Sequence, residues 1–276
     1  MQDKTIAFIG GGNMTRSLVG GLISDGTDPE RIRVSDPNTE QQDLLLRQHP
    51  VNVFSGNPEA ATGADVVVMA VKPQIMRSAA LQTAEAIKAR RPLVMSIAAG
   101  IREGDLARWL GGEVAIVRAM PNTPALVQSG ATALYANALV APEQREFAES
   151  IMRAVGLTLW LDREALMDAV TALSGSGPAY FFLVMEALES AGIELGLPAE
   201  TARLLTLQTA LGAARLALES DDSAAMLRRR VTSPGGTTER AIQVLEDGHL
   251  GSTIERAVKA ACARSEELAR ALGDDQ

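Results

Sequence analysis

The feature that most constrains the fold stands near the start of the chain, where a short apolar run meets consecutive glycines. Ile6–Ile9 is apolar throughout, Gly10–Gly12 follows directly, and Leu18, Val19 and Leu22 then repeat with a helical period. An uninterrupted apolar run is typical of a parallel strand that is covered on both faces. A buried strand, a glycine turn and a helix in this order predict the first β–α unit of a parallel sheet.

The glycine turn also carries part of a dinucleotide-binding fingerprint, G-x-G-x-x-G. In this pattern the first glycine makes the tight turn, and the second lets a pyrophosphate approach the backbone at the helix N-terminus. Gly10 and Gly12 fill these two places, whereas Thr15 stands where a third Gly or Ala is usual. An ordinary glycine-rich connection is the alternative, but the position directly after a strand favours dinucleotide binding.

Strand-like apolar runs and helical stretches alternate through the first half of the chain. This alternation predicts an α/β fold with a parallel sheet and right-handed crossovers. The further predicted strands are Ile32–Ser35, Val51–Phe54, Asp65–Val71, Leu93–Ile97, Val114–Arg118, Ala131–Tyr135 and Leu157–Leu161. The helices predicted between them are Gln41–Gln48, Gln74–Lys88, Glu103–Trp109 and Pro142–Val155.

Asp36 follows the second predicted strand. In a dinucleotide fold this is about where an acid binds the adenosine ribose. Asp36-Pro37-Asn38 is also a plausible plain turn, so both interpretations stay open.

Strand signals stop at about Asp162, and the rest of the chain reads as helix. Ala165–Gly192 contains only three charged residues, and Gly175–Pro178 lies inside it, where proline predicts a kink. A helix that is apolar around most of its circumference must be buried from several sides. We therefore predict burial in an interlocked homodimer, with a compact monomeric bundle as the alternative. The predicted domains are residues 1–162 and 163–276, and the further predicted helices are Leu197–Leu218, Ser223–Val231, Glu239–Glu246 and His249–Leu272.

Composition excludes several classes of function. The net charge is −8 and no basic stripe stands out, which argues against a nucleic-acid partner. Cys262 is the only cysteine, and His49 and His249 are the only histidines, so we predict no disulfide, no structural metal site and a reducing, cytoplasmic location. The N-terminal residues lack a signal-peptide pattern, and no run reaches the roughly 18 apolar residues of a membrane span.

Five motifs follow one another along the chain: Ile9–Met14, Ala70–Gln74, Arg118–Pro124, Leu173–Tyr180 and Ser233–Glu246. Together, in this order, they make the chain resemble the pyrroline-5-carboxylate reductase family over nearly its whole length. The resemblance implies an N-terminal Rossmann-type domain and an all-α C-terminal dimerisation domain, with higher assembly in many members. It also implies NAD(P)H-dependent reduction of 1-pyrroline-5-carboxylate to L-proline, the last step of proline biosynthesis.

The residues are consistent with that reaction. A protonated cyclic imine is already electrophilic, so the protein has to position a dihydronicotinamide, hold the carboxylate and donate hydrogen bonds to the ring nitrogen. We expect the backbone amides of Gly235, Gly236, Thr237 and Thr238 to bind the carboxylate. The hydroxyls of Ser233, Thr237 and Thr238 are expected to donate, with Thr238 as the catalytic group. Plain capping of the helix from Glu239 is the alternative.

The resemblance also implies further site residues. Asp221 matches a substrate-side acid, although the His-Pro that often follows it in the family is Asp222-Ser223 here. Lys72 is a candidate cation near the nicotinamide, or a solvated lysine at a strand end. The cofactor-binding residues implied are Gly10, Gly11, Gly12, Asn13, Met14, Ser35, Asn57, Ala70, Val71, Lys72, Pro73, Ala98 and Ala99.

Cofactor choice is finely balanced in the sequence. Asp36 would accept a hydrogen bond from a ribose 2′-hydroxyl and would repel a 2′-phosphate, which favours NAD. Ser35, Asn38 and Thr39 are potential donors to a phosphate if Asp36 points away. The family mostly uses NADP, so we expect NADPH to be preferred and NADH to be usable.

Two other functions remain to be compared with this one. A beta-hydroxyacid dehydrogenase would also join a Rossmann domain to a helical one, but it needs a catalytic lysine on the interdomain helix, and Leu166–Gly192 contains none. A non-catalytic dinucleotide sensor or scaffold would not need the intact Ser233–Thr238 segment.

Overall fold

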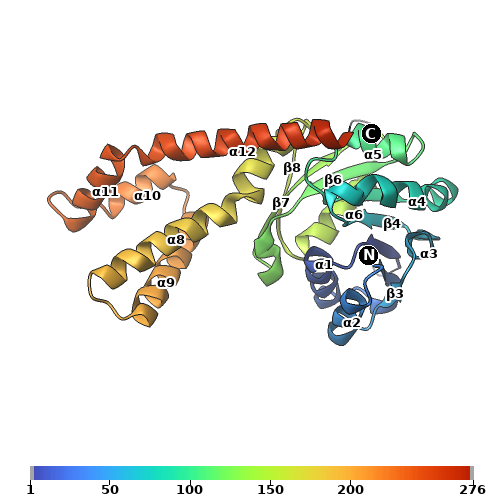
Figure 1. Cartoon of the computed structure of the whole chain (residues 1–276), viewed down its shortest axis with the longest axis horizontal. Coiled ribbons are helices and arrows are strands. Elements are labelled where there is room, and N and C mark those ends of the chain that lie inside the picture. The colour runs from blue at the N-terminus through green and yellow to red at the C-terminus, as the bar shows by residue number, and fades with distance from the viewer. Residues whose placement is uncertain (1–2, 274–276) are drawn as a thin grey trace. The chain divides into compact units, whose positions relative to one another are not determined.

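The computed structural model describes residues 3–273, which form two compact units (Figure 1). The first unit contains the chain up to Ser176 together with the residues from Ala261 onward, and the second contains Gly177–Ala260. Residues 163–176 and the end of the last helix therefore pack within the first unit, and the predicted domain boundary after residue 162 stays a prediction.

The first unit is built on a sheet that has eight strands within the described residues, in the order β3-β2-β1-β4-β5-β6-β7-β8. Neighbours from β3 to β6 pair in parallel, as predicted. β7 instead runs antiparallel to β6, because the short connection through the 3₁₀ turn η3 (Thr123–Val127) leaves no room for a crossover. The strands are β1 (Ile6–Ile9), β2 (Ile32–Ser35), β3 (Asn52–Phe54), β4 (Val66–Met69), β5 (Leu93–Ser96), β6 (Ile116–Met120), β7 (Gly130–Ala136) and β8 (Gly156–Trp160).

Helices cover both faces of this sheet and create two cores. Phe8 packs on one face with the apolar residues of α1, α2 and α6, whereas Ile9 packs on the other face with those of α3, α4 and α5. β1, β4 and β5 are buried at every position, which confirms the prediction from their continuous apolar runs. The helices of the first unit are α1 (Asn13–Ser24), α2 (Thr39–Gln48), α3 (Asn57–Ala61), α4 (Met76–Arg90), α5 (Glu103–Trp109), α6 (Pro142–Arg153) and α7 (Leu166–Val170).

The apolar segment Ala165–Gly192 does not form the one kinked helix that we predicted, but is divided into α7, a π-helical turn and a further helix. Thr171–Gly175 (η4) is a π-helical turn, with the Ser176 N–H donating to the Thr171 carbonyl at 2.8 Å. A new helix, α8 (Gly177–Glu194), then begins, with Pro178 in its first turn, where proline costs no hydrogen bond. Proline therefore starts a helix here instead of bending one.

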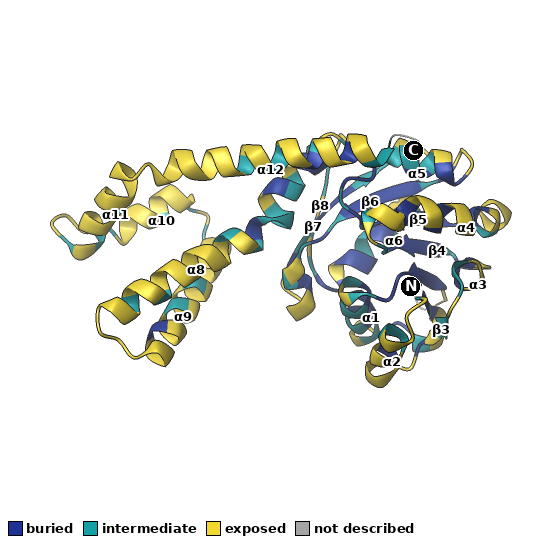
Figure 2. Ribbon diagram, in the orientation of Figure 1, coloured by how far each residue is buried: buried dark blue, intermediate teal, exposed yellow. Residues whose placement is uncertain are grey.

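The second unit is entirely helical and has almost no core of its own. Gly177 and Ala202 are its only buried residues, and large apolar side chains such as Phe181 and Phe182 are 68% and 63% exposed. Figure 2 shows this exposed surface along α8 and its neighbours. Besides α8, the unit contains α9 (Ala199–Leu218), α10 (Ala224–Arg230), α11 (Thr237–Asp247) and the first part of α12 (Leu250–Gly273).

The end of α12 is anchored to the first unit by a buried carboxylate. Asp168, on α7, accepts hydrogen bonds from the Ser265 hydroxyl at 2.7 Å and from the Arg102 guanidinium at 2.7 Å. Because Asp168 is only 4% exposed, both contacts are needed to satisfy its charge. This cluster explains why residues after Ala261 pack with the sheet.

Candidate functional site

The carboxyl edge of the sheet gathers the predicted cofactor residues. β1 and β4 are neighbours in the sheet, and the helices that follow them, α1 and α4, pack on opposite faces. Such a switch point leaves a crevice at the strand ends, where ligands bind in this class of fold. The predicted residues at the ends of β1, β2, β4 and β5 all lie at this edge, and Asn57 begins α3 after β3.

The glycine turn has the backbone that a dinucleotide requires. Gly10 has a φ of +107°, and a Cβ there would lie 2.7 Å from the Ala70 carbonyl oxygen, so only glycine fits. Gly12 precedes α1 in extended backbone, and a Cβ there would meet nothing within 4 Å. The backbone at Gly12 is thus open beside the free N–H groups of a helix start, which fits a pyrophosphate.

Thr15 stands where a third glycine is usual, and α1 still packs closely against the sheet at this position. Its side chain is buried at 1% exposure, and its hydroxyl donates to the Gly10 carbonyl at 2.6 Å. The hydroxyl therefore braces the turn that the fingerprint glycine creates.

We expect Thr15→Val to lower the free energy of unfolding by about 1–3 kcal/mol, because an isosteric methyl leaves the buried Gly10 carbonyl without its donor. Thr15→Ser, which keeps the hydroxyl, is the matched control. Urea unfolding of the two variants checks this, and equal stabilities would contradict the bracing role.

Asp36 is engaged by the backbone on both sides. Its Oδ2 accepts the Gly11 N–H at 2.8 Å, and its Oδ1 accepts the Asn38 N–H at 2.9 Å. The carboxylate therefore makes the turn of one interpretation and also holds the glycine loop, while its contact with the ribose stays a prediction. The Ser35 side chain, expected near the ribose, is fully buried and donates to Asn57 Oδ1 at 2.8 Å.

Lys72, Ala98 and Ala99 lie at the ends of the next two strands. Lys72 is exposed and precedes the 3₁₀ turn η2 (Pro73–Ile75). Ala98 is 7% exposed and Ala99 is half-buried, which gives small apolar walls at the end of β5. These positions are compatible with a cation and apolar walls near the nicotinamide, and both roles stay predictions.

The predicted substrate loop lies in the second unit, between α10 and α11. Gly236 is the N-cap of α11, so a glycine of this loop does cap the helix, whereas no side-chain hydroxyl does. Within the described residues, the hydroxyls of Ser233, Thr237 and Thr238 have no hydrogen-bond partner. Polar groups left unused in a loop of this kind are available to a ligand.

Of the four amides that we expected to be free, those of Thr237 and Thr238 are free and those of the two glycines are not. The Gly235 N–H donates to Glu239 Oε2 at 2.8 Å, and the Gly236 N–H donates to the Ser233 carbonyl at 3.0 Å. The N–H groups of Thr237, Thr238 and Glu239, which open α11, have no intrahelical acceptor. An anion at this loop would therefore meet the amides of the first helical turn.

Asp221 lies outside this loop, in the connection before α10. It is exposed, and within the described residues no hydrogen bond or ion pair links it to Ser233–Thr238. Its neighbour Asp222 pairs with Arg230 instead. The structure thus does not bring Asp221 to the substrate loop by a direct contact.

Asn122 was noted in the sequence only as part of a motif, yet it organises the loop after β6. Its Nδ2 donates to the Ser174 carbonyl at 3.3 Å and to the Ser174 hydroxyl at 3.2 Å, while its Oδ1 accepts the Ala131 N–H at 2.9 Å. A Pro-Asn-Thr-Pro run directly after a strand was the available signal. Asn122 thereby connects the carboxyl edge to the π-helical turn.

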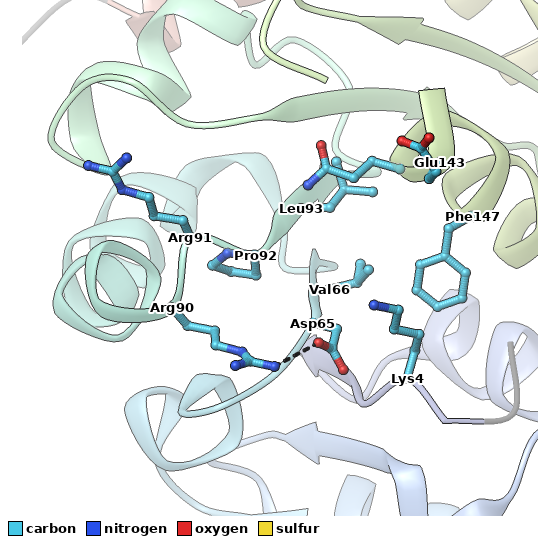
Figure 3. A pocket seen from close by; sticks show the side chains of 10 residues that line it. Lys4, Asp65, Val66, Arg90, Arg91, Pro92, Leu93, Glu143 and Phe147 are labelled. Carbon is cyan, nitrogen blue, oxygen red and sulfur yellow. Dashed lines mark hydrogen bonds and ion pairs between the residues drawn. The ribbon is translucent and has the colours of Figure 1, made fainter. Parts of the chain in front are cut away.

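A hollow of about 260 Å³ lies at the opposite edge of the sheet, beside Val66, the first residue of β4 (Figure 3). Asp65 on its wall accepts the Thr5 N–H at 2.9 Å and pairs with Arg90 at 3.0 Å. Burial alone would raise the pKa of Asp65, but these contacts and the charge of Lys4 lower it below its usual value. The Asp65 carboxylate in this hollow is thus already paired within the protein, and the hollow lies away from the glycine turn.

No group of three or more His, Cys, Asp or Glu residues in the described part of the chain is arranged to hold a metal ion. Over the same residues, no helix is long and apolar enough to span a membrane.

Comparisons with known proteins place the chain in a family. Residues 164–268 match the family described as pyrroline-5-carboxylate reductase dimerisation, and residues 5–100 match the family described as NADP oxidoreductase, coenzyme F420-dependent. The pyrroline-5-carboxylate reductase of Pseudomonas aeruginosa is 52% identical, and the alignment covers 99% of this chain and 100% of that protein.

Solved structures agree. The reductase of Coxiella burnetii superposes with a TM-score of 0.92 at 49% identity, covering 96% of this chain and 98% of that one. The Plasmodium falciparum pyrroline carboxylate reductase, solved with NADP bound, has a TM-score of 0.87 at 31% identity, covering 98% and 99%. Full-length identity at this level, with the same fold, shows that the chain belongs to the pyrroline-5-carboxylate reductase family.

Proposed function

We propose that this protein reduces 1-pyrroline-5-carboxylate to L-proline, with NADPH as the preferred reductant. The observation that carries the proposal is the full-length match, at 52% identity, to a curated reductase of this name. The open glycine turn and the unused donors of the Ser233–Thr238 loop support it, because they supply the two kinds of group that the reaction needs.

The first unit supplies the cofactor groups. When bound, NADPH supplies the hydride that adds to the imine carbon and leaves as NADP⁺. Gly10 makes the tight turn, Gly12 lets the pyrophosphate approach the backbone, and the N–H groups at the start of α1 hold its charge. Ala98 and Ala99 are proposed as apolar walls on the nicotinamide side, and Lys72 as a nearby cation.

The second unit supplies the substrate groups. We assign the carboxylate to the amides of Thr237, Thr238 and Glu239, where the positive end of the α11 dipole favours an anion. We assign the Thr238 hydroxyl to the ring nitrogen. The substrate enters as a protonated iminium, so its nitrogen keeps that proton and becomes an amine when the carbon accepts the hydride.

The choice of NADP rests on two findings. A relative in this family was solved with NADP bound, and the region 5–100 matches an NADP oxidoreductase family. The Asp36 carboxylate also accepts two backbone N–H groups, which partly compensate the charge that would repel a 2′-phosphate.

A direct assay tests the function. The purified protein should oxidise NADPH only when 1-pyrroline-5-carboxylate is added, and L-proline should form in equal amount. A protein that binds NADPH tightly yet shows no turnover would point to the sensor alternative. Oxidation of 3-hydroxy acids with NADP⁺, without activity on the imine, would point to a beta-hydroxyacid dehydrogenase.

We further propose a homodimer, formed through the second unit. This unit has only Gly177 and Ala202 buried, and one matched family is described by its dimerisation. A second copy is the natural cover for the exposed apolar residues of α8 and α9. The cytoplasmic location remains the prediction made from the single cysteine.

Because folding and dimerisation then form one equilibrium, the melting temperature should rise with protein concentration. A thermal-unfolding series over a hundredfold concentration range checks this, with light scattering at each concentration. A stable, active monomer at micromolar concentration would end the dimer proposal.

A further inference from the structure

Arg16 is a residue of α1 in the first unit to which the proposed function assigns no role. It lies in the first half of α1, beside the glycine turn, and reaches toward α2. Its Nη1 donates to the Gln41 side-chain oxygen at 2.6 Å and more weakly to the Gly11 carbonyl at 3.4 Å, and its Nη2 donates to the Asn13 side-chain oxygen. The guanidinium is therefore held in place between two segments of the chain.

All of these acceptors are neutral. Among the described residues no carboxylate pairs with Arg16, in contrast to Arg102 and Arg118, which pair with Asp168 and Glu164. A guanidinium carries five N–H donors, so contacts to Gly11, Asn13 and Gln41 leave some of them for a ligand. The side chain thus combines a fixed position with a positive charge that no ion pair compensates.

The position of this charge matters because of what surrounds it. The contacts of Arg16 join the glycine turn to the first turn of α2, the two segments that flank the carboxyl end of β2. The adenosine ribose of a dinucleotide lies at this strand end. Two acids, Asp36 and the exposed Glu40, lie near this strand end. Because they repel a 2′-phosphate, a phosphate bound there needs a cation beside it.

We propose that Arg16 is the specificity-determining residue that selects NADP over NAD, by donating to the 2′-phosphate of the adenosine ribose. This inference rests on the proposed use of NADP. Gln41 and Asn13 orient the guanidinium, and arginine is suited to the task because its planar donors match phosphate oxygens. The sequence at the end of β2 offers Pro37 and no arginine, so the cation comes from α1.

Binding measurements separate this role from activity. Isothermal titration calorimetry should compare NADPH, NADH, adenosine 2′,5′-bisphosphate and adenosine 5′-monophosphate on the wild type, Arg16→Gln and Arg16→Lys. Arg47→Gln is the matched control, because Arg47 is an exposed arginine in the last turn of α2, away from the glycine turn.

We expect Arg16→Gln to raise the Kd of NADPH and of the 2′,5′-bisphosphate by about 10- to 100-fold, the usual size of a charge-assisted contact. The Kd values of NADH and the monophosphate should change by no more than about 2-fold, which is below the effect of one lost hydrogen bond. Arg16→Lys should fall between wild type and Arg16→Gln, and Arg47→Gln should match the wild type.

The outcomes are distinguishable. Equal weakening of NADPH and NADH would make Arg16 a structural brace and overturn the inference, while the reductase assignment stands. Unchanged binding, or a wild type that binds NADH more tightly than NADPH, would also overturn it. A wild type that binds neither cofactor would refute the proposed function as well. If Arg16→Gln does not fold, the ratio of the two Kd values in Arg16→Lys decides.

Discussion

Gly12→Val is expected to fold normally and to lose its cofactor. A Cβ at Gly12 would meet no protein atom within 4 Å, and the extended backbone there suits any residue. The substitution therefore causes neither a clash nor backbone strain in the folded protein. The same open space is where the pyrophosphate must approach the backbone. We therefore expect the Kd of NADPH to rise at least about 100-fold, or ~2.7 kcal/mol, with little change in melting temperature.

Gly104→Val is the matched control for this prediction. Gly104 is an exposed glycine in α5 where a Cβ would also meet nothing within 4 Å, and it is not among the proposed cofactor-binding residues. NADPH titration and thermal unfolding of both variants check the result. Normal NADPH binding by Gly12→Val would mean that the glycine turn is only a structural connection.

Gly10 provides the contrast within the same turn. Its φ of +107° and the 2.7 Å approach to the Ala70 oxygen mean that Gly10→Ala strains the protein itself. Gly10 is thus required by the fold, whereas Gly12 is required by the ligand.

Thr238→Ala is the second change with a large expected effect. The Thr238 hydroxyl has no partner among the described residues, so its loss should alter stability by less than about 1 kcal/mol, the value of a capping hydroxyl. Turnover should fall about 10- to 100-fold, because the ring nitrogen gains the lone pair that accepts the Thr238 hydrogen bond only as the iminium becomes an amine. This is the lower part of the range for such a donor, since the protonated imine is reactive by itself.

Thr232→Ala is the control for a hydroxyl outside the proposed contact, because Thr232 donates to the Arg228 carbonyl. Steady-state kinetics should show a loss of kcat in Thr238→Ala, with the Kd of NADPH unchanged. Thr232→Ala should keep the wild-type kcat.

Gly236→Val tests the carboxylate side of the same loop. A Cβ at Gly236 would already lie 3.0 Å from the Ser233 carbonyl oxygen, and the larger side chain would fill the space before the first turn of α11. We expect a raised KM for the imine. Wild-type kinetics in Thr238→Ala, together with normal substrate binding by Gly236→Val, would place the active site elsewhere.

The local patterns of the sequence determined the elements and the kind of site. Ile6–Ile9 and the other continuous apolar runs are buried strands because each must lie between two layers of helix, and this requirement is visible in consecutive residues. The Gly10–Gly12 turn and the predicted helix Glu103–Trp109 are likewise properties of neighbouring residues. The motif order identified the family for the same reason.

Only the tertiary structure decided what the polar groups do. Asp36 holds the Gly11 amide, Ser35 donates to Asn57, and Arg16 joins α1 to Gln41, and each partner is more than twenty residues away in the chain. The Gly235 amide is taken by Glu239 through a turn geometry that composition does not reveal.

The limits of the compact units also depended on the tertiary structure. Ser265 bonds to Asp168 across 97 positions of sequence, which brings the end of α12 back to the first unit. The period and the polarity of consecutive residues determine whether they form a helix or a strand and which face is buried. The partner of each polar group is fixed only when distant segments pack, because a buried charge or hydroxyl takes whichever donor or acceptor the fold brings within reach.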